Sequence, residues 1–184
     1  RPMLLPRIQP IGDLAEEGVW FAQALGEIPA AISPTRRHLL LARLILRHEN
    51  AAPDQAYQVA QAAGLARQLA DLLDEVQREG LSFDKLADLV PEALSQHWQH
   101  TLDFLRIIAL YWPRILQEEG VIDPVERRTR VLQSIARAWA KTPPPYPVIA
   151  AGSTGSQPAT AALLAAIAGM EQGAVVLPGL DAEM

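Results

Sequence analysis

The sequence predicts a mainly α-helical protein with a small α/β part near its C-terminal end. Three observations support this class. Apolar residues recur at helical spacing through most of residues 30–142, and the run Pro143-Pro144-Pro145 then forms a stiff linker. Beyond the linker, two compact apolar runs typical of buried parallel strands flank a helix-like segment. We therefore expect an N-terminal lead-in over residues 1–29, a helical domain over 30–142 and an α/β fragment over 146–184.

Two helices are expected in the first half of the helical domain. The first starts at Ser33-Pro34, with serine as the N-cap and proline at the first helical position, and runs to about His48. The second opens at Pro53-Asp54 and ends at Gly80, where a C-cap glycine belongs. Its apolar stripe consists of Leu65, Leu69, Leu72, Leu73 and Val76.

The second half of the helical domain contains further helix signals. A short helix is expected over 82–90, and a long one from Pro91 that is kinked or restarted near Pro113, because proline lacks an N–H and clashes with the preceding turn. Asp123-Pro124 and Glu126 read as N-cap, first helical position and capping-box acid of a last helix. Several large residues on these helices should be buried: Trp98, Leu105, Trp112, Leu132 and Trp139.

Composition excludes several classes of protein. The chain has 184 residues, 49% of them hydrophobic, and a net charge of −5, so any nucleic-acid contact must come from a local basic patch. Cysteine is absent, which excludes disulfides and thiolate chemistry in these residues. No apolar run reaches the ~18–20 residues that span a bilayer, and the start lacks signal-peptide features, so we expect a cytoplasmic protein without a membrane partner. The first residue is Arg1 and the last is Met184, so we expect a piece of a longer chain.

The α/β fragment contains a strand–turn–helix–strand unit: a strand over 147–151, a turn over 152–158, a helix over 159–168 and a strand over 174–177. The sequence of this turn does not match three known ligand-binding or catalytic motifs. A phosphate-binding P-loop needs Gly-Lys-Ser/Thr where Gln157-Pro158 stand, and the glycine spacing fits neither a dinucleotide fingerprint nor a nucleophile elbow. We therefore expect a tight turn with Ser156 or Gln157 near the helix start, and no cofactor.

Acidic and histidine clusters give no clear catalytic or metal site. His97, His100 and Asp103 lie one turn apart, but no fourth ligand is visible, so a solvated polar face is the alternative that we favour. The remaining carboxylates have arginines nearby, which favours helix-surface ion pairs over acid–base catalysis: Asp71, Asp74, Glu75 and Glu79.

Basic residues form two stripes, each on one helix face. The first consists of Arg36, Arg43 and Arg47, and the second of Arg127, Arg130, Arg137 and Lys141. Such faces either contact phosphates or are the solvated sides of amphipathic helices, and the sequence leaves both open.

Four segments together resemble a known family: Leu5 to Asp13, Asp74 to Gly80, His97 to Leu105 and Val148 to Ser156. They are similar to the AddB subunit of bacterial AddAB-type helicase–nucleases, in its alphaproteobacterial form. The likeness covers essentially the whole chain, through phrase-level similarities and no signature motif. It implies a helical insertion domain followed by a partial RecA-like (P-loop NTPase-like) fragment of parallel sheet.

The resemblance also implies a role. In active relatives the first of these strands ends in an Asp-Glu pair that holds magnesium and activates water, whereas this chain has Ala151-Gly152 there. Neither residue can ligate magnesium or act as a base, so the resemblance implies a non-enzymatic motor remnant with no catalytic residue, cofactor or metal. Its implied partners are DNA and an AddA-type subunit, and its implied role is that of scaffold and DNA-strand guide in double-strand-break repair.

Two other classes stay open. A helical adaptor domain without a DNA role needs only the apolar content and mixed surface charge seen here. A nucleotide-binding enzyme is disfavoured by the missing lysine and carboxylates. DNA affinity that falls steeply with salt would separate the DNA-contacting class from the adaptor.

Overall fold

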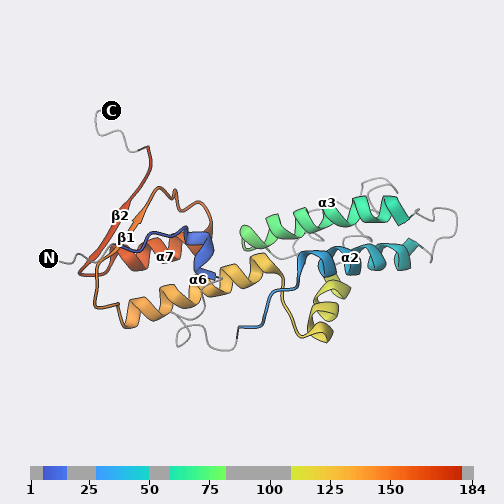
Figure 1. The fold of residues 1–184 in the computed structure, drawn as a ribbon, viewed down its shortest axis with the longest axis horizontal. Helices are drawn as coiled ribbons and strands as arrows, with labels where there is room; N and C mark the ends of the chain where they lie inside the picture. Colours follow the sequence, from blue (N-terminus) through green and yellow to red (C-terminus); the bar gives the residue numbers. More distant parts are fainter. Residues whose placement is uncertain (1–5, 16–27, 50–58, 82–108, 180–184) are drawn as a thin grey trace, which may run out of the picture. The chain divides into compact units, whose positions relative to one another are not determined.

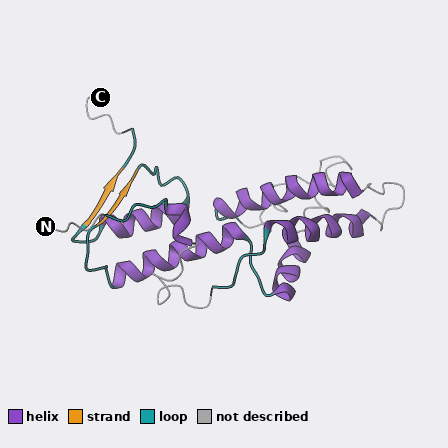
Figure 2. Cartoon of the chain, viewed as in Figure 1, coloured by secondary structure: helices purple, strands orange, loops and turns teal. Residues whose placement is uncertain are grey.

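A computed structural model describes residues 6–15, 28–49, 59–81 and 109–179 (Figure 1). These residues are mainly helical, with a small two-stranded parallel sheet (Figure 2), which confirms the coarse fold class. The chain divides into two compact units. Unit 1 consists of residues 1–28 and 127–184, and unit 2 of residues 29–126.

Unit 2 contains helices α2 (Pro34–Glu49) and α3 (Val59–Arg78) and a helical segment over 109–119. The predicted start of α2 is confirmed, because the backbone N–H of Arg36 donates to the Ser33 hydroxyl at 3.4 Å. The predicted start at Pro53-Asp54 lies outside the described residues, as do the helix over 82–90 and the first part of the helix from Pro91.

The core of unit 2 forms where α2 packs on α3. Leu41 and Ile45 of α2 are 0% and 1% exposed. The predicted stripe of α3 is confirmed at Leu69 and Leu73, which are buried, but it was wrong at Leu72, which is 40% exposed. Small residues take its place in the buried face, because they let two helices approach closely: Ala62, Ala66 and Ala70.

Glycine ends two helices of unit 2. Gly80 has φ +66°, its N–H donates to Gln77 O, and the N–H of Leu81 donates to Val76 O. This pair of hydrogen bonds is typical of a helix that ends at a glycine in the left-handed conformation, so the predicted C-cap is confirmed. Gly120 ends the segment 109–119 in the same way.

The segment 109–119 is helical on both sides of Pro113, so the predicted restart near Trp112 is not found. Trp112 is buried, at 2% exposed, as predicted. The predicted burial of Trp98 and Leu105 falls outside the described residues.

Unit 1 contains most of α6 (Pro124–Lys141), then β1 (Val148–Ala151), α7 (Pro158–Ala168) and β2 (Gly173–Val176), with a short 3₁₀ helix, η1 (Ile11–Ala15). The two strands pair in parallel with Val148 opposite Gly173. Helix α7 connects them and lies alongside both strands (Figure 1). The predicted strand–turn–helix–strand unit is therefore present, with strand bounds shifted by one residue.

The core of unit 1 includes the apolar face of α6. Val131, Leu132, Ile135 and Ala136 pack in one cluster with residues of η1, β1 and α7. Trp139 is only half-buried against this cluster. The division of the structure thus differs from the expected domain boundaries, which assigned α6 to the helical domain because the proline run follows it and left residues 1–29 as a separate lead-in.

The sheet is less buried than predicted. Val148, Ala150 and Val175 face α7, whereas Ile149 and Val176 are 69% and 57% exposed. Successive residues of a strand point to opposite faces, and only one face of this sheet is covered by a helix among the described residues. The expectation of fully buried strands was wrong for this face.

Gly173 is required by the close approach of β2 to α7. A Cβ at this position would collide with the carbonyl oxygen of Ile167, which is backbone and cannot move aside. Among the described residues, no helix combines the length and apolar character needed to cross a membrane.

We expect Gly173→Ala to lower the free energy of unfolding by roughly 1–3 kcal/mol, because the added methyl group forces α7 and β2 apart. Gly64→Ala is the matched control, since an added Cβ meets nothing within 4 Å at this exposed position of α3. The control should be neutral or stabilising by up to about 1 kcal/mol. Urea denaturation followed by circular dichroism measures both, and equal effects of the two changes would contradict the steric argument.

Candidate functional site

The first basic stripe, on α2, is only partly available for a ligand. Arg36 binds Glu119 through two short hydrogen bonds, from Nε at 2.6 Å and from Nη2 at 2.7 Å. This pairing raises the pKa of Arg36 and lowers the pKa of Glu119, in both cases chiefly through the side-chain hydrogen bond. Arg43 and Arg47 are exposed on the same helix.

The second basic stripe lies on α6. Arg130, Arg137 and Lys141 are exposed, and Arg127 is half-buried. The Nε of Arg137 donates to the backbone oxygen of Gln133 at 3.1 Å, which holds the side chain along its own helix. The stripe shares one helix with the buried apolar residues of unit 1, so α6 is amphipathic in the sense that the sequence predicted.

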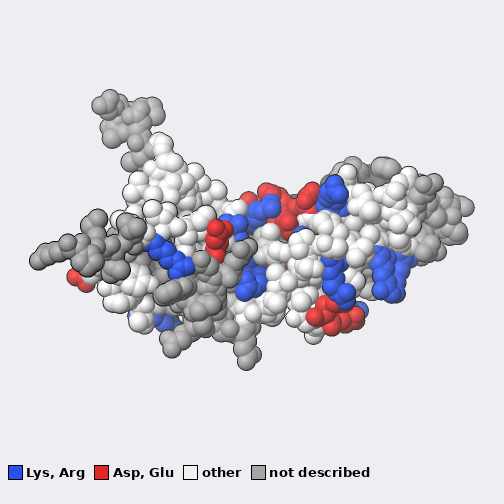
Figure 3. All heavy atoms as spheres, in the orientation of Figure 1, with Lys and Arg blue, Asp and Glu red and all other residues white. Residues whose placement is uncertain are grey.

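Charge is mixed on the molecular surface. On the face drawn in Figure 3, basic and acidic side chains lie next to each other at several places. A polyanion would therefore have to bind a local group of arginines rather than a broad basic surface.

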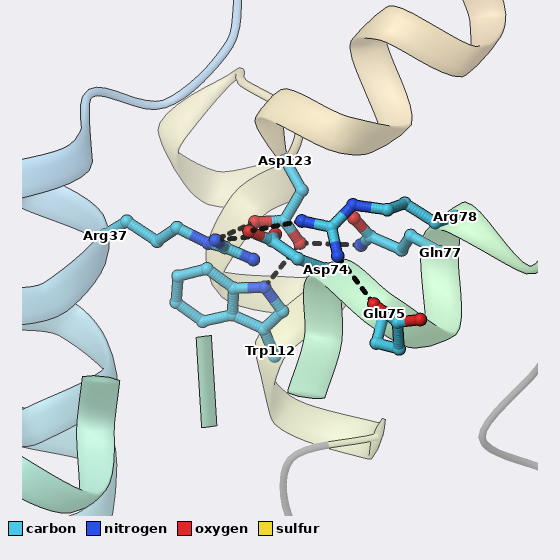
Figure 4. Close-up of polar contacts among 7 residues, drawn as sticks. All are labelled: Arg37, Asp74, Glu75, Gln77, Arg78, Trp112 and Asp123. Carbon is cyan, nitrogen blue, oxygen red and sulfur yellow. Dashed lines mark hydrogen bonds and ion pairs between the residues drawn. The ribbon is translucent and has the colours of Figure 1, made fainter. Parts of the chain in front are cut away.

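A buried ionic cluster lies in unit 2 (Figure 4). Asp123 is 0% exposed, and its Oδ1 lies 2.7 Å from Arg37 Nε. Its Oδ2 accepts hydrogen bonds from Trp112 Nε1 at 2.8 Å and from Gln77 Nε2 at 2.9 Å. Arg37 also contacts Asp74, with 2.8 Å between Nη1 and Oδ1.

This cluster is structural in character. Both oxygens of Asp123 have close partners, and the partners come from α2, α3 and the segment 109–119. Asp123 directly precedes α6, as predicted, but these oxygens serve the cluster rather than acting as a solvent-exposed cap. The expected helix-surface ion pairs are found on α3, where the Arg78 guanidinium lies 3.9 Å from Asp74 and 2.6 Å from Glu75.

Sequence reasoning missed Arg37. The available signal was its position four and eight residues before Leu41 and Ile45, which places an arginine in line with the apolar stripe of α2. A charged residue at such a position is buried only when it is paired, so it predicts a carboxylate partner.

A hollow of about 430 Å³ lies in unit 1, where β1 runs into α7. Gly152 and Gly155 in the connecting segment have φ +78° and +67°, and Gln157 precedes the helix start at Pro158, as predicted. Ala151 and Gly152 line the hollow beside η1. The polar lining comes from α6, the turn and α7, and consists of Arg128, Ser153, Thr154, Ser156, Gln157 and Thr160.

The lining of this hollow is rich in hydrogen-bond donors and contains no Asp or Glu among the described residues. Gln157 is the N-cap of α7 and makes no side-chain capping bond, and Pro158 has no N–H. Arg128 reaches η1, where a Cβ on Gly12 would lie 2.9 Å from its Nη2. The sequence analysis named neither Arg128 nor Thr160. Arg128 lies outside the basic stripe of α6, and Thr160 belongs to no motif.

The chain has no significant match among protein-family models, curated proteins or solved structures.

No group of three or more His, Asp or Glu residues that could hold a metal ion is found within the described ranges. The possible metal ligands named from the sequence, His97, His100 and Asp103, lie outside the described ranges.

We expect Glu119→Gln to lower the melting temperature at neutral pH, because it removes the charge that binds Arg36. The pKa of Glu119 is lowered in the folded protein, so its pairing stabilises the fold above the ordinary carboxyl pKa, roughly 4.3, and this contribution is lost as pH falls through the lowered value. The difference from the unchanged chain should therefore become smaller as the pH falls below about 4.3. Thermal scans of both proteins from neutral pH to about pH 3.5 measure it, with exposed Glu118→Gln as the control. Identical profiles for the two variants would contradict the pairing.

We expect Asp123→Ala to destabilise the protein by about 3–5 kcal/mol, because it leaves the buried guanidinium of Arg37 and the indole N–H of Trp112 without their partner. The exposed Asp71→Ala on α3 is the matched control, with an expected change within about 0.5 kcal/mol. Urea denaturation gives both values. A loss below about 1 kcal/mol for Asp123→Ala would mean that the cluster does not hold unit 2 together.

Proposed function

We propose that the chain is a non-catalytic, helicase-like segment of an AddB-type subunit of a DNA double-strand-break repair helicase–nuclease. In this role it is a scaffold that guides a DNA strand, works in the cytoplasm with an AddA-type partner and does not itself hydrolyse ATP. The proposal takes the helical part as an insertion domain and the α/β part as a RecA-like fragment.

One observation carries the non-catalytic part of this proposal. The parallel strand–turn–helix–strand arrangement is present, but Ala151 and Gly152 stand at the end of β1 and the hollow beside them has no carboxylate in its described lining. Magnesium binding needs hard oxygen ligands, and activation of a water molecule needs a base. A site with this lining is what we expect of a motor-like domain that does not hydrolyse ATP.

The exposed basic face of α6 supports the DNA-contacting part. Arg130, Arg137 and Lys141 lie on the side of the helix away from its buried residues, so they can meet a phosphate backbone without disturbing the core of unit 1. On α2, Arg43 and Arg47 are the further candidates, whereas Arg36 would first have to leave Glu119.

A second candidate function is that of a helical adaptor without a DNA role. It is favoured by the exposed apolar residues of the sheet, Ile149, Val176 and the adjacent Leu177. Exposed apolar groups of this kind are typical of surfaces that contact other proteins.

We expect the combined change of Arg130, Arg137 and Lys141 to Ala to weaken binding of the 184-residue chain to single-stranded DNA and to reduce the slope of log K against log salt by about one for each lost phosphate contact. Fluorescence anisotropy with a labelled oligonucleotide at low ionic strength measures both quantities. The control is Arg67→Ala with Arg114→Ala, two exposed arginines outside the stripes.

Equal affinity and slope for the triple variant and the control, with both proteins folded, would rule out the α6 face. Absence of any salt-dependent DNA binding by the unchanged chain would favour the adaptor.

A further inference from the structure

The described lining of the hollow between β1 and α7 carries a positive charge and no negative charge. Its described lining combines one guanidinium, four hydroxyls and an amide, with no carboxylate to balance the arginine. A cation has no anionic ligand in this described lining. Thr154 and Ser156 bond each other and Ser153 accepts from the Gly155 N–H, so the guanidinium and the Thr160 hydroxyl are the groups that an apolar ligand would leave unpaired. The chemistry of the lining therefore fits an anion.

Thr160 contributes a hydroxyl to the hollow. The residue is only 8% exposed and lines the hollow, and no hydrogen bond of its side chain to another described residue is found. Its Oγ1 is not among the buried atoms that lack a partner, so the hydroxyl is open to the hollow. It can therefore donate to an acceptor that binds there.

The start of α7 adds a second set of donors. The first-turn N–H groups of a helix have no partner within the helix, and the Gln157 side chain supplies none here. Because Pro158 has no N–H, the groups of Ala159 and Thr160 are the first that can face a ligand. They carry the partial positive charge of the helix N-terminus, which favours anions.

Arg128 supplies the full charge. It lies on α6 and its guanidinium rests against Gly12 of η1, so two elements position it beside the turn. No ion pair or hydrogen bond joins it to another described residue. Arg128 is exposed to solvent, and a guanidinium can form paired hydrogen bonds to two oxygens of a phosphate.

We propose that this hollow binds a phosphate group without a metal ion. Arg128 neutralises its charge, and the Thr160 hydroxyl and the first-turn N–H groups of α7 donate to its oxygens. The phosphate is either a phosphodiester of a nucleic-acid strand or a free or terminal phosphate, which share this chemistry. The site stands whether or not the α6 face binds DNA.

The test is a titration of the ¹⁵N-labelled 184-residue chain with inorganic phosphate in the presence of a chelator, followed by amide chemical shifts. We expect saturable shifts of the amides from Ser153 to Thr160. Arg128→Gln should raise the dissociation constant about tenfold or more, as expected for the loss of a hydrogen bond to a charged group. Thr160→Val, which keeps the shape and removes the hydroxyl, should raise it by about two- to tenfold. Arg114→Gln, at an exposed position of unit 2, is the control and should change nothing.

A second arm identifies the source of the phosphate. If a single-stranded oligonucleotide without terminal phosphate shifts the same amides and Arg128→Gln weakens its binding, the occupant is a backbone phosphodiester. If only inorganic phosphate or a terminally phosphorylated oligonucleotide shifts them, the site takes a free or terminal phosphate. Both results support the site, including where the α6 variant leaves DNA affinity unchanged and the proposed function fails.

Three results would overturn the proposal: no saturable shift in the β1–α7 turn, shifts that Arg128→Gln and Thr160→Val leave unchanged in a folded protein, or shifts that appear only when magnesium is added.

Discussion

The buried carboxylate of Asp123 is the interaction on which unit 2 most depends. A fully buried charge is tolerated only when it is paired and hydrogen-bonded, and here the partners Arg37, Gln77 and Trp112 come from three different helical segments. Satisfying one carboxylate therefore fixes the mutual positions of those segments. Apolar side chains of α2 and α3 form much of the core cluster of unit 2, and the ionic cluster favours one arrangement of these helices.

Unit 1 depends on a different constraint, the close approach of its backbone segments. Gly173 lets β2 start against the end of α7, and the left-handed glycines of the β1–α7 turn let the chain reverse tightly at the carboxyl end of β1. Ligands of α/β proteins bind at this end of parallel strands. With Ala151 and Gly152 there and Arg128 alongside, the described lining at this location carries a positive charge and no carboxylate.

Much of the fold could be predicted from local signals. Ser33-Pro34, Gly80 and Pro158 mark element ends through backbone geometry alone, and the structure places them as expected. Features that depend on distant partners could not be predicted in this way. Leu72 is exposed while alanines share the buried face of α3, and α6 packs in the core of unit 1 although the residues that precede it belong to unit 2. The basic stripes were visible from spacing, but the pairing of Arg36 with Glu119 and the position of Arg128 beside Thr160 require tertiary structure.

We propose above all that the hollow at the end of β1 holds an anion without a metal ion. A crystal structure of the chain grown with phosphate and a chelator tests it most directly. The account predicts a tetrahedral anion within hydrogen-bond distance of the Arg128 guanidinium and the Thr160 hydroxyl. A structure in which the hollow is empty at saturating phosphate, or in which a carboxylate side chain pairs with Arg128, would contradict it.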